Sequence, residues 1–265
     1  MTESDYIALI DKAAEDWFGI KADPGDAKKF VSWLLETHGK INHDIINEVF
    51  SSGDAAAFLT VNETYFFREP LHFSFLLDFL PFFQKSGKNS ILRICTAGVA
   101  TGCEAYSIAM LIEAHNRDLA VPLLYHIDAF DINPKVIQQA IMGSYGQRSL
   151  REDGSSFHYL TDRYLKKEER FYIDSILKKN ICFFVHNLMN ELPKNDYDLI
   201  FFRNAFIYFT PRNRERILSN LSSALIEGGI LIMGVSETSG VQHSDLESKN
   251  INDVFYFIKQ KSVVE

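Results

Sequence analysis

The chain has 265 residues and a formal net charge of −8, which argues against a surface that binds nucleic-acid phosphates. No apolar run is long enough to span a bilayer, and the acidic first residues lack a signal-peptide pattern, so we expect a cytoplasmic protein without stable membrane insertion. The three cysteines form no Cys-x-x-Cys pair, so neither a zinc knuckle nor a disulfide framework is expected. Cys95 and Cys182 lie in apolar strand patterns and are expected in the core.

The first 60 residues have the pattern of short helices. Apolar residues recur at helical spacing from Tyr6 to Trp17, Asp23-Pro-Gly25 indicates a turn, and further helices are expected at 27–38 and about 43–50. No strand pattern is present, so we expect a small all-helical domain over residues 1–60. This segment carries eleven acidic residues, five lysines and no arginine.

From about residue 90, apolar strand patterns alternate with helical ones. Alternation of this kind indicates a mostly parallel sheet with helices on both faces. We therefore expect an α/β domain over 90–265, preceded by a linking segment at 61–89. Charge clusters break the alternation at about 144–180, where an insertion is expected. The expected strands are 91–95, 123–130, 181–186, 198–203, 230–235 and 254–258, and a helix is expected at 211–226 before Gly228-Gly229.

A glycine turn follows the first of these strands and predicts a nucleoside-binding site. Gly98 and Gly102 would let the backbone approach a ligand, and Asp131 ends the next strand, where its carboxylate could accept both ribose hydroxyls. Glu104 follows the second glycine, where it would repel a phosphate but suit a cationic amino group. S-adenosylmethionine meets both requirements. A turn that only packs a helix, with an incidental Asp131, remains the alternative.

Several polar residues fall just beyond expected strand ends, where ligands bind in open α/β sheets. They are the segment 96–104, Asp131, Asn187 and Asn204. Their convergence at one edge of the sheet favours a site more strongly than any single motif. No pair of histidines has metal-ligand spacing, so no metal site is expected, and His186 is interpreted as a structural residue.

Five motifs occur in one order along the chain and closely resemble those of the CheR-type chemotaxis methyltransferases. In that family they read approximately Asn-x-Thr-x-Phe-Phe-Arg, Ser-Thr-Gly-Glu-Glu-Pro-Tyr-Ser, Asp-Ile-Asp, Asn-Leu and Arg-Asn-x-x-Ile-Tyr-Phe. Here they read Asn62-Glu-Thr64-Tyr-Phe66-Phe67-Arg68, Thr101-Gly-Cys-Glu-Ala-Tyr-Ser107, Phe130-Asp-Ile-Asn133, Asn187-Leu188 and Arg203-Asn204-Ala-Phe-Ile207-Tyr208-Phe209.

The resemblance implies a Rossmann-like, S-adenosylmethionine-dependent methyltransferase domain with an N-terminal helical domain and a small inserted β subdomain. It also implies methylation of glutamate side chains on the cytoplasmic helices of a chemoreceptor, with S-adenosylhomocysteine as the product. The residues expected around the cofactor are Asn62, Thr64, Arg68, Gly98, Glu104, Asp131, Asn187, Leu188, Arg203 and Asn204.

The chain departs from the family pattern in two places. Cys103 and Ala105 stand where the family has Glu and Pro, while the retained Glu104 aligns with the glutamate that contacts the cofactor. Well-studied members present a basic N-terminal surface to the receptor, whereas this segment is acidic. A local basic face could still form from its lysines, namely Lys21, Lys28 and Lys29.

Methyl transfer to a glutamate carboxylate needs no general base, because the acceptor is already ionised at neutral pH. Catalysis then depends on positioning the acceptor and removing water from it. Arg68 and Tyr208 are the candidate catalytic residues, since a guanidinium and a phenol can both donate hydrogen bonds to a carboxylate. Alternatively, Arg68 pairs with Glu63 or Glu69, and Tyr208 is simply a buried aromatic residue.

Two other functions remain open from the sequence. The acidic helical domain would suit a methyltransferase that acts on a different protein or on a small carboxylate. Cys103 would suit a signalling module that binds S-adenosylmethionine without transferring its methyl group, although the presence of Arg68, Asp131, Asn204 and Tyr208 argues against it.

Overall fold

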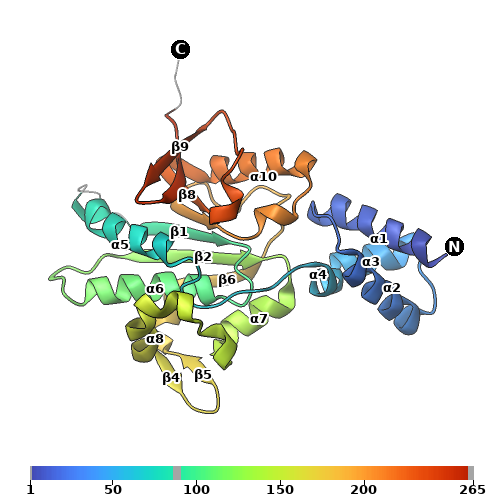
Figure 1. The fold of residues 1–265 in the computed structure, drawn as a ribbon, viewed down its shortest axis with the longest axis horizontal. Coiled ribbons are helices and arrows are strands. Elements are labelled where there is room, and N and C mark those ends of the chain that lie inside the picture. The colour runs from blue at the N-terminus through green and yellow to red at the C-terminus, as the bar shows by residue number, and fades with distance from the viewer. Residues whose placement is uncertain (1, 86–90, 262–265) are drawn as a thin grey trace.

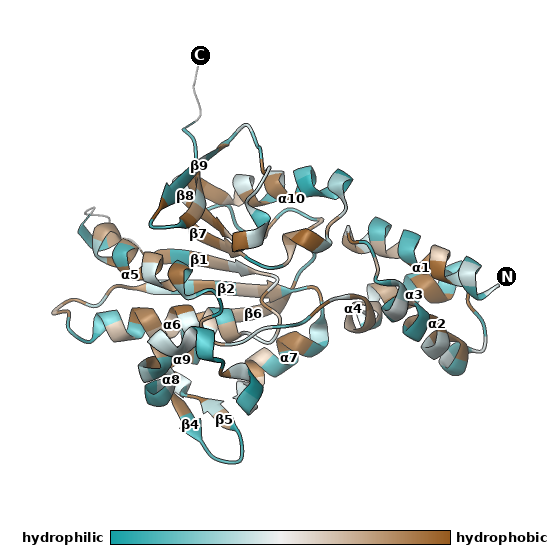
Figure 2. Ribbon diagram, viewed as in Figure 1, coloured by the Kyte–Doolittle hydropathy of each residue, from teal (hydrophilic) through white to brown (hydrophobic). Residues whose placement is uncertain are grey.

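A computed structural model describes residues 2–85 and 91–261. The chain forms a group of short helices at its N-terminal end and an α/β domain built on one large sheet (Figure 1). The strands of the sheet are predominantly hydrophobic, while the outward faces of the helices are more polar (Figure 2). The boundaries expected at residues 89–90 and at residue 265 lie outside the described residues.

The N-terminal helices confirm the expected all-helical region, and their ends follow from local sequence. Thr2 and Asp5 form a capping box at the start of the first helix, which stops at Gly19 because a glycine tolerates the left-handed conformation there, with φ of 75°. Asp23 caps the second helix, just before a proline at its first turn. The helices are α1 (Glu3–Phe18), α2 (Pro24–His38), α3 (His43–Ser51) and α4 (Asp54–Leu59).

The large sheet has the strand order β6-β2-β1-β7-β8-β10-β9. The first five strands of this order are parallel, and β10 and β9 are antiparallel additions at one edge. The carboxyl ends of the parallel strands therefore lie along one edge of the sheet. The strands are β1 (Leu92–Ala97), β2 (Tyr125–Asp131), β6 (Ile181–Val185), β7 (Tyr197–Phe202), β8 (Leu225–Met233), β9 (Leu246–Ile251) and β10 (Val254–Lys259).

Alternate residues of the central strands pack into two different cores, as the two-residue period of a strand requires. In β7, Leu199 and Phe201 pack with α5 (Pro70–Lys85) and α6 (Cys103–Asn116). Ile200 and Phe202 pack with α10 (Pro211–Ala224) and with the N-terminal helices. The helical domain thus shares a hydrophobic core with one face of the sheet.

The insertion expected at 144–180 forms a small subdomain below the sheet in Figure 1. It follows α7 (Pro134–Met142) and holds a three-stranded sheet in the order β3-β5-β4. The exposed charge run at 166–170 covers the end of β4 and the connection to β5. The elements are β3 (Ser144–Tyr145), η1 (Gln147–Ser149), η2 (Glu152–Phe157), α8 (His158–Tyr164), β4 (Leu165–Lys167), β5 (Phe171–Ile173) and α9 (Ser175–Lys178).

Several elements differ from the sequence interpretation. Strand β9 has no counterpart in it, and residues 70–85 of the linking segment form helix α5. The helix expected at 211–226 ends at Ala224, so that Gly228 and Gly229 lie within β8, beside a register shift against β7. Cys182 is exposed rather than buried because β6 is an edge strand. Cys95, in the central strand β1, is buried as expected.

No helix among the described residues is both long and apolar enough to cross a membrane. Helix α2 has one buried face, formed by Ala27, Phe30, Val31 and Leu34, whereas α6 is buried along most of its length.

Gly102→Ala should destabilise the fold more than Gly39→Ala. Both glycines have positive φ, 90° and 70°, which costs a non-glycine residue about 1–2 kcal/mol. Only at Gly102 would a Cβ atom also collide with packed atoms, 2.9 Å from the Ala140 Cβ and 3.2 Å from the Phe183 ring. We expect about 1–3 kcal/mol of additional destabilisation there. Denaturant unfolding of both variants is the measurement, and equal losses would contradict the steric argument.

Candidate active site

A cavity of about 560 Å³ lies at the carboxyl ends of β1, β2, β6 and β7. Its walls come from four parts of the chain: the end of α1 and the start of α2, the segment 59–68, the strand ends, and the turn after β7. Of the residues expected at the site, these line the cavity: Thr64, Arg68, Gly98, Glu104, Asp131, Asn187, Leu188, Arg203, Asn204 and Tyr208.

The glycine turn brings the ends of β1 and β2 together. The backbone N–H groups of Gly98 and Val99 both donate to the Phe130 carbonyl, at 2.9 and 3.0 Å. Gly98 has φ of 71°, and a Cβ atom there would lie 3.3 Å from the Cβ of Ala205. The turn then leads into α6, whose first residues include Glu104. The glycine therefore permits a close approach between the turn and the residues after β7.

Asp131 is buried and is held in place by backbone donors. Its Oδ1 accepts from Asn133 N and its Oδ2 from Ala100 N, both at 2.9 Å. Burial raises the pKa of Asp131, and the backbone N–H groups partly oppose that shift. A carboxylate has about four acceptor positions, and Asp131 lines the cavity, so its oxygens can accept further hydrogen bonds from a ligand there.

The side chains of two expected cofactor residues, Asn62 and Asn187, form hydrogen bonds within the protein. Asn62 does not line the cavity; its amide donates to the Thr60 carbonyl at 3.0 Å. Asn187 does line it, but its Nδ2 donates to the Trp17 carbonyl at 2.7 Å and its Oδ1 accepts from Met189 N at 2.9 Å. The side chain of Asn187 thus ties the end of β6 to the end of α1.

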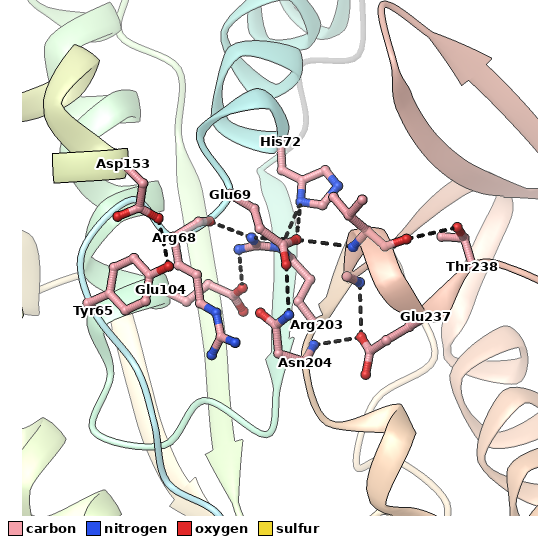
Figure 3. A network of polar contacts seen from close by, with 12 residues as sticks. Tyr65, Arg68, Glu69, His72, Glu104, Asp153, Arg203, Asn204, Glu237 and Thr238 are labelled. Atoms are coloured by element: carbon pink, nitrogen blue, oxygen red, sulfur yellow. Dashed lines mark hydrogen bonds and ion pairs between the residues drawn. The ribbon is translucent and has the colours of Figure 1, made fainter. Parts of the chain in front are cut away.

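Arg203 lies at the centre of a polar network that joins several segments (Figure 3). Its Nε contacts the Nδ1 atom of His72 at 2.9 Å, and its Nη1 donates to Glu104 at 2.8 Å. Its Nη2 donates to the Arg68 carbonyl and to Glu69, the latter at 3.2 Å. From the sequence, Glu69 is expected only as an alternative ion-pair partner of Arg68, and no role is expected for His72. The position of Glu69, directly after the first motif, was the available signal.

The ionisation states in this network follow from burial and from the guanidinium. Burial and the neighbouring Arg203 lower the pKa of His72, so its neutral ring accepts the Arg203 Nε–H at Nδ1. Burial alone would raise the pKa of Glu69, but contacts with His72, Arg203 and Asn204 lower it well below its usual range. Since His72 Nδ1 accepts from Arg203, we attribute that lowering mainly to Arg203 and Asn204. Burial raises the pKa of Glu104 although Arg203 opposes it.

The turn after β7 is fixed by two carboxylates. Asn204 has φ of 58°, and its Nδ2 donates to Glu69 at 2.7 Å. Glu237, from the turn η4 (Val235–Glu237), accepts from the backbone N–H groups of Asn204 at 2.6 Å, Gly234 at 3.0 Å and Ile207 at 3.2 Å. Glu237 thereby positions the short helix η3 (Phe206–Tyr208), which carries Tyr208 into the cavity wall.

The N-terminal domain also holds the segment that contains Tyr208. Ile20 forms an antiparallel bridge with Phe209, the Lys21 N–H donates to the Tyr208 carbonyl at 3.2 Å, and the Thr210 N–H donates to the Gly19 carbonyl at 2.9 Å. The backbone of Tyr208 is therefore fixed from both sides of the cavity. No sequence pattern predicts this bridge, because it depends on contacts between residues far apart in the chain.

The guanidinium of Arg68 forms neither of the two ion pairs considered from the sequence, which were with Glu63 and Glu69. Its Nη1 donates to the Glu63 backbone carbonyl at 3.0 Å, whereas the Glu63 carboxylate pairs with Arg151 at 2.7 Å. No ion pair joins Arg68 to Glu69 within residues 2–85 and 91–261. Arg68 lines the cavity and leaves N–H groups for another partner.

The strand ends of the parallel sheet present a glycine turn, the buried carboxylate of Asp131 and, beside the turn, the carboxylate of Glu104. This arrangement is typical of nucleoside-binding α/β domains, the class to which S-adenosylmethionine-dependent methyltransferases belong. Residues 62–255 match the family model described as "CheR methyltransferase, SAM binding domain". The chain belongs to this CheR methyltransferase family, and its cofactor is S-adenosylmethionine.

Curated relatives agree with this assignment. A chemotaxis protein methyltransferase of Borreliella burgdorferi is 35% identical over 188 residues, which cover 68% of this chain and 65% of that protein. A chemotaxis protein methyltransferase of Listeria monocytogenes is 28% identical over 234 residues, or 86% of each chain. A probable biofilm formation methyltransferase, WspC, of Pseudomonas aeruginosa is 29% identical over 222 residues, covering 78% of this chain and 50% of that protein.

The donor and acceptor groups of the cavity fit this cofactor. Two carboxylates, the buried Asp131 and the partly buried Glu104, line a space that would take a nucleoside carrying an amino acid. Asp131 would hold the ribose hydroxyls and Glu104 the ammonium group, with Gly98 allowing close backbone approach.

Asp131→Ala should weaken binding of S-adenosylmethionine about tenfold to a hundredfold, because hydrogen bonds to a charged acceptor contribute roughly 1.5–3 kcal/mol. Calorimetric titration is the measurement. Asp128→Asn is the matched control, since Asp128 lies in the same strand and is buried, but bonds to Tyr197 at 2.9 Å and does not line the cavity. Equal affinity of Asp131→Ala and the wild-type protein would remove Asp131 from the binding site.

Glu104→Gln should also weaken the cofactor, whereas Cys103→Ala should have little effect on affinity because Cys103 does not line the cavity. Protonation of Glu104 removes its negative charge, so wild-type affinity should fall as the pH decreases. Since the pKa of Glu104 is raised above 4.5 by burial, this fall should begin at a higher pH than for an exposed glutamate. The dependence should be shallower in Glu104→Gln. A greater loss in Cys103→Ala would mean that the turn is misaligned.

Proposed function

We propose that the protein transfers the methyl group of S-adenosylmethionine to glutamate carboxylates on the cytoplasmic helices of a chemoreceptor. The observation that carries the proposal is that Arg68 and Tyr208 line the same cavity as Asp131 and Glu104. One pair of residues can orient an acceptor carboxylate, while the other pair holds the cofactor. The names of the Borreliella and Listeria relatives support a chemotaxis role.

The cavity provides orientation rather than acid–base chemistry. The cofactor supplies a methyl group on a sulfonium, and an ionised glutamate needs no base to accept it. Arg68 can hold one carboxylate through parallel hydrogen bonds. Burial raises the pKa of Tyr208 above its ordinary value of 10.0, so the phenol remains protonated at neutral pH and can donate to the acceptor. A looser grip by Arg68 suits catalysis, because strong binding of the ionised ground state would raise the barrier.

The charges of the N-terminal domain support the methyl-transfer chemistry and the receptor substrate unequally, because few of its lysines are free to bind an acidic receptor helix. Lys28 pairs with Glu3 at 3.0 Å, and Lys29 pairs with Asp26 at 2.7 Å. Lys21 lines the cavity. Two of the three lysines that could form a basic face therefore already have acidic partners. This favours, as the second candidate, a protein substrate other than a strongly acidic receptor helix, with the same methyl-transfer chemistry.

Tritiated S-adenosylmethionine, incubated with the protein and a chemoreceptor cytoplasmic fragment, tests the proposal. Base-labile label on the receptor is expected, because carboxyl methyl esters hydrolyse in base. Receptor variants with the labelled glutamates changed to glutamine should lose the label. Base-labile label on another protein would favour the second candidate, and cofactor binding without transfer to any carboxylate would favour a non-catalytic binding module.

Tyr208→Phe should slow methyl transfer about fivefold to a hundredfold, equivalent to roughly 1–3 kcal/mol, with a smaller change in cofactor affinity. The variant removes one hydroxyl and keeps the ring, so packing should be nearly preserved. Arg68→Ala should behave similarly, although Arg68 is also expected to contact the cofactor. Single-turnover methylation at saturating cofactor, beside equilibrium binding, is the measurement.

Tyr106→Phe is the control for these variants. It removes a buried hydroxyl that donates to the Ala140 carbonyl at 2.8 Å and does not line the cavity, so stability should fall while the single-turnover rate is retained. A wild-type rate in Tyr208→Phe would assign the Tyr208 hydroxyl a structural role. Parallel losses of binding and rate would place it in the cofactor pocket.

A further inference from the structure

The buried guanidinium of Arg203 contacts two carboxylates that lie in different environments. Glu104, at 2.8 Å, lines the cavity together with Arg203. Glu69, at 3.2 Å, does not line the cavity and lies behind Arg203. The Arg203 side chain is only 1% exposed, so its charge must be balanced by groups within the protein.

The charge balance changes with the number of carboxylates around Arg203. Glu104 and Arg203 alone would form a pair without net charge, and Glu104 would attract a cationic amino group only weakly. Arg68 and Asp131, which have opposite charges, also line the cavity, and the positive charge of Arg68 lowers the pKa of Glu104 as that of Arg203 does. With Glu69 included, two carboxylates face one guanidinium, because His72 accepts a hydrogen bond from Arg203 as a neutral ring. The cluster then carries a net charge of about −1, and Glu104 is the member that the cavity exposes.

We propose that Glu69 is a positioning residue that neutralises Arg203 from behind, leaving the charge of Glu104 for the ammonium group of the cofactor. The inference rests on the assignment of S-adenosylmethionine as cofactor, and it is independent of the methyl acceptor. It gives Glu69 a role in ligand specificity although it does not line the cavity.

The hydrogen bonds of Arg203 support this assignment. Its N–H groups donate to His72, Glu104, the Arg68 carbonyl and Glu69, which occupies four of the five donors of a guanidinium. Arg203 is therefore poorly placed to hold the carboxylate of the cofactor. Its effect on the ligand is its charge, and that is the quantity that Glu69 offsets.

Glu69 is itself held firmly in position. Its Oε1 accepts from the Asn204 Nδ2 at 2.7 Å, and its Oε2 also accepts from the Val235 N–H at 3.2 Å. Its backbone has φ of 57°, in the left-handed region that non-glycine residues rarely adopt. These contacts stabilise the strained backbone and keep the carboxylate against Arg203 (Figure 3).

The test compares the affinity for S-adenosylhomocysteine with that for its deaminated analogue, in which hydrogen replaces the amino group. The dissociation constant of the analogue divided by that of S-adenosylhomocysteine, both measured by calorimetry, reports the preference for the ammonium group. Glu69→Gln should lower this ratio about tenfold, because Glu104 would then be neutralised by Arg203. Glu237→Gln is the matched control, since Glu237 also braces Asn204 but contacts only backbone N–H groups; it should lower stability and keep the ratio.

The double variant Glu69→Gln/Arg203→Met distinguishes a charge effect from a structural one. It removes both charges, so Glu104 is again unopposed and the preference for the ammonium should return. A merely structural role for Glu69 predicts no such recovery. An unchanged ratio in folded Glu69→Gln, or no recovery in the double variant, would overturn the proposal, and the double variant alone decides if Glu69→Gln does not fold. Failure to methylate a chemoreceptor would leave this result intact, whereas failure of the wild-type protein to bind S-adenosylhomocysteine would remove its basis.

Discussion

The active-site region depends on the need to balance the buried guanidinium of Arg203. An unpaired charge at this depth would cost several kcal/mol. The structure meets the requirement with two segments: residues 68–72, which supply the Arg68 carbonyl, Glu69 and His72, and the start of α6, which supplies Glu104. Arg68 and Glu104 line the cavity together with Arg203. The stability of the fold and the geometry of the cofactor site are therefore linked through one side chain.

The cavity is also shaped by contacts between the N-terminal helical domain and the α/β domain. The bridge between Ile20 and Phe209, together with the bond from Asn187 to the Trp17 carbonyl, joins the helical domain to the strand ends. Because one hydrophobic core contains both the N-terminal helices and a face of the sheet, this arrangement is supported by packing as well as by hydrogen bonds. A partner that binds the helical domain would thus contact an element that holds the backbone of Tyr208.

The polar groups of the cavity fall into two pairs with different expected partners. Asp131 and Glu104 are carboxylates suited to hydroxyl and ammonium groups, whereas Arg68 and Tyr208 are donors suited to an acceptor carboxylate. Methyl transfer to an ionised carboxylate requires alignment and exclusion of water, and no proton transfer. Because the reaction needs no general base, the two donors are the groups expected to influence its rate.

The alternation of strands and helices, the inserted subdomain and the convergence of Gly98, Asp131 and Asn204 on one edge of the sheet could all be predicted from the sequence, because they follow from periodicity and from the parallel arrangement of strands. Strand β9 and the helix that begins at Pro70 were not predicted. The contact of Glu69 with Arg203 and the bond from Asn187 to the helical domain are visible only in the folded chain. Such roles depend on which side chains meet across large sequence separations, and the periodicity of a single chain carries no record of those distances.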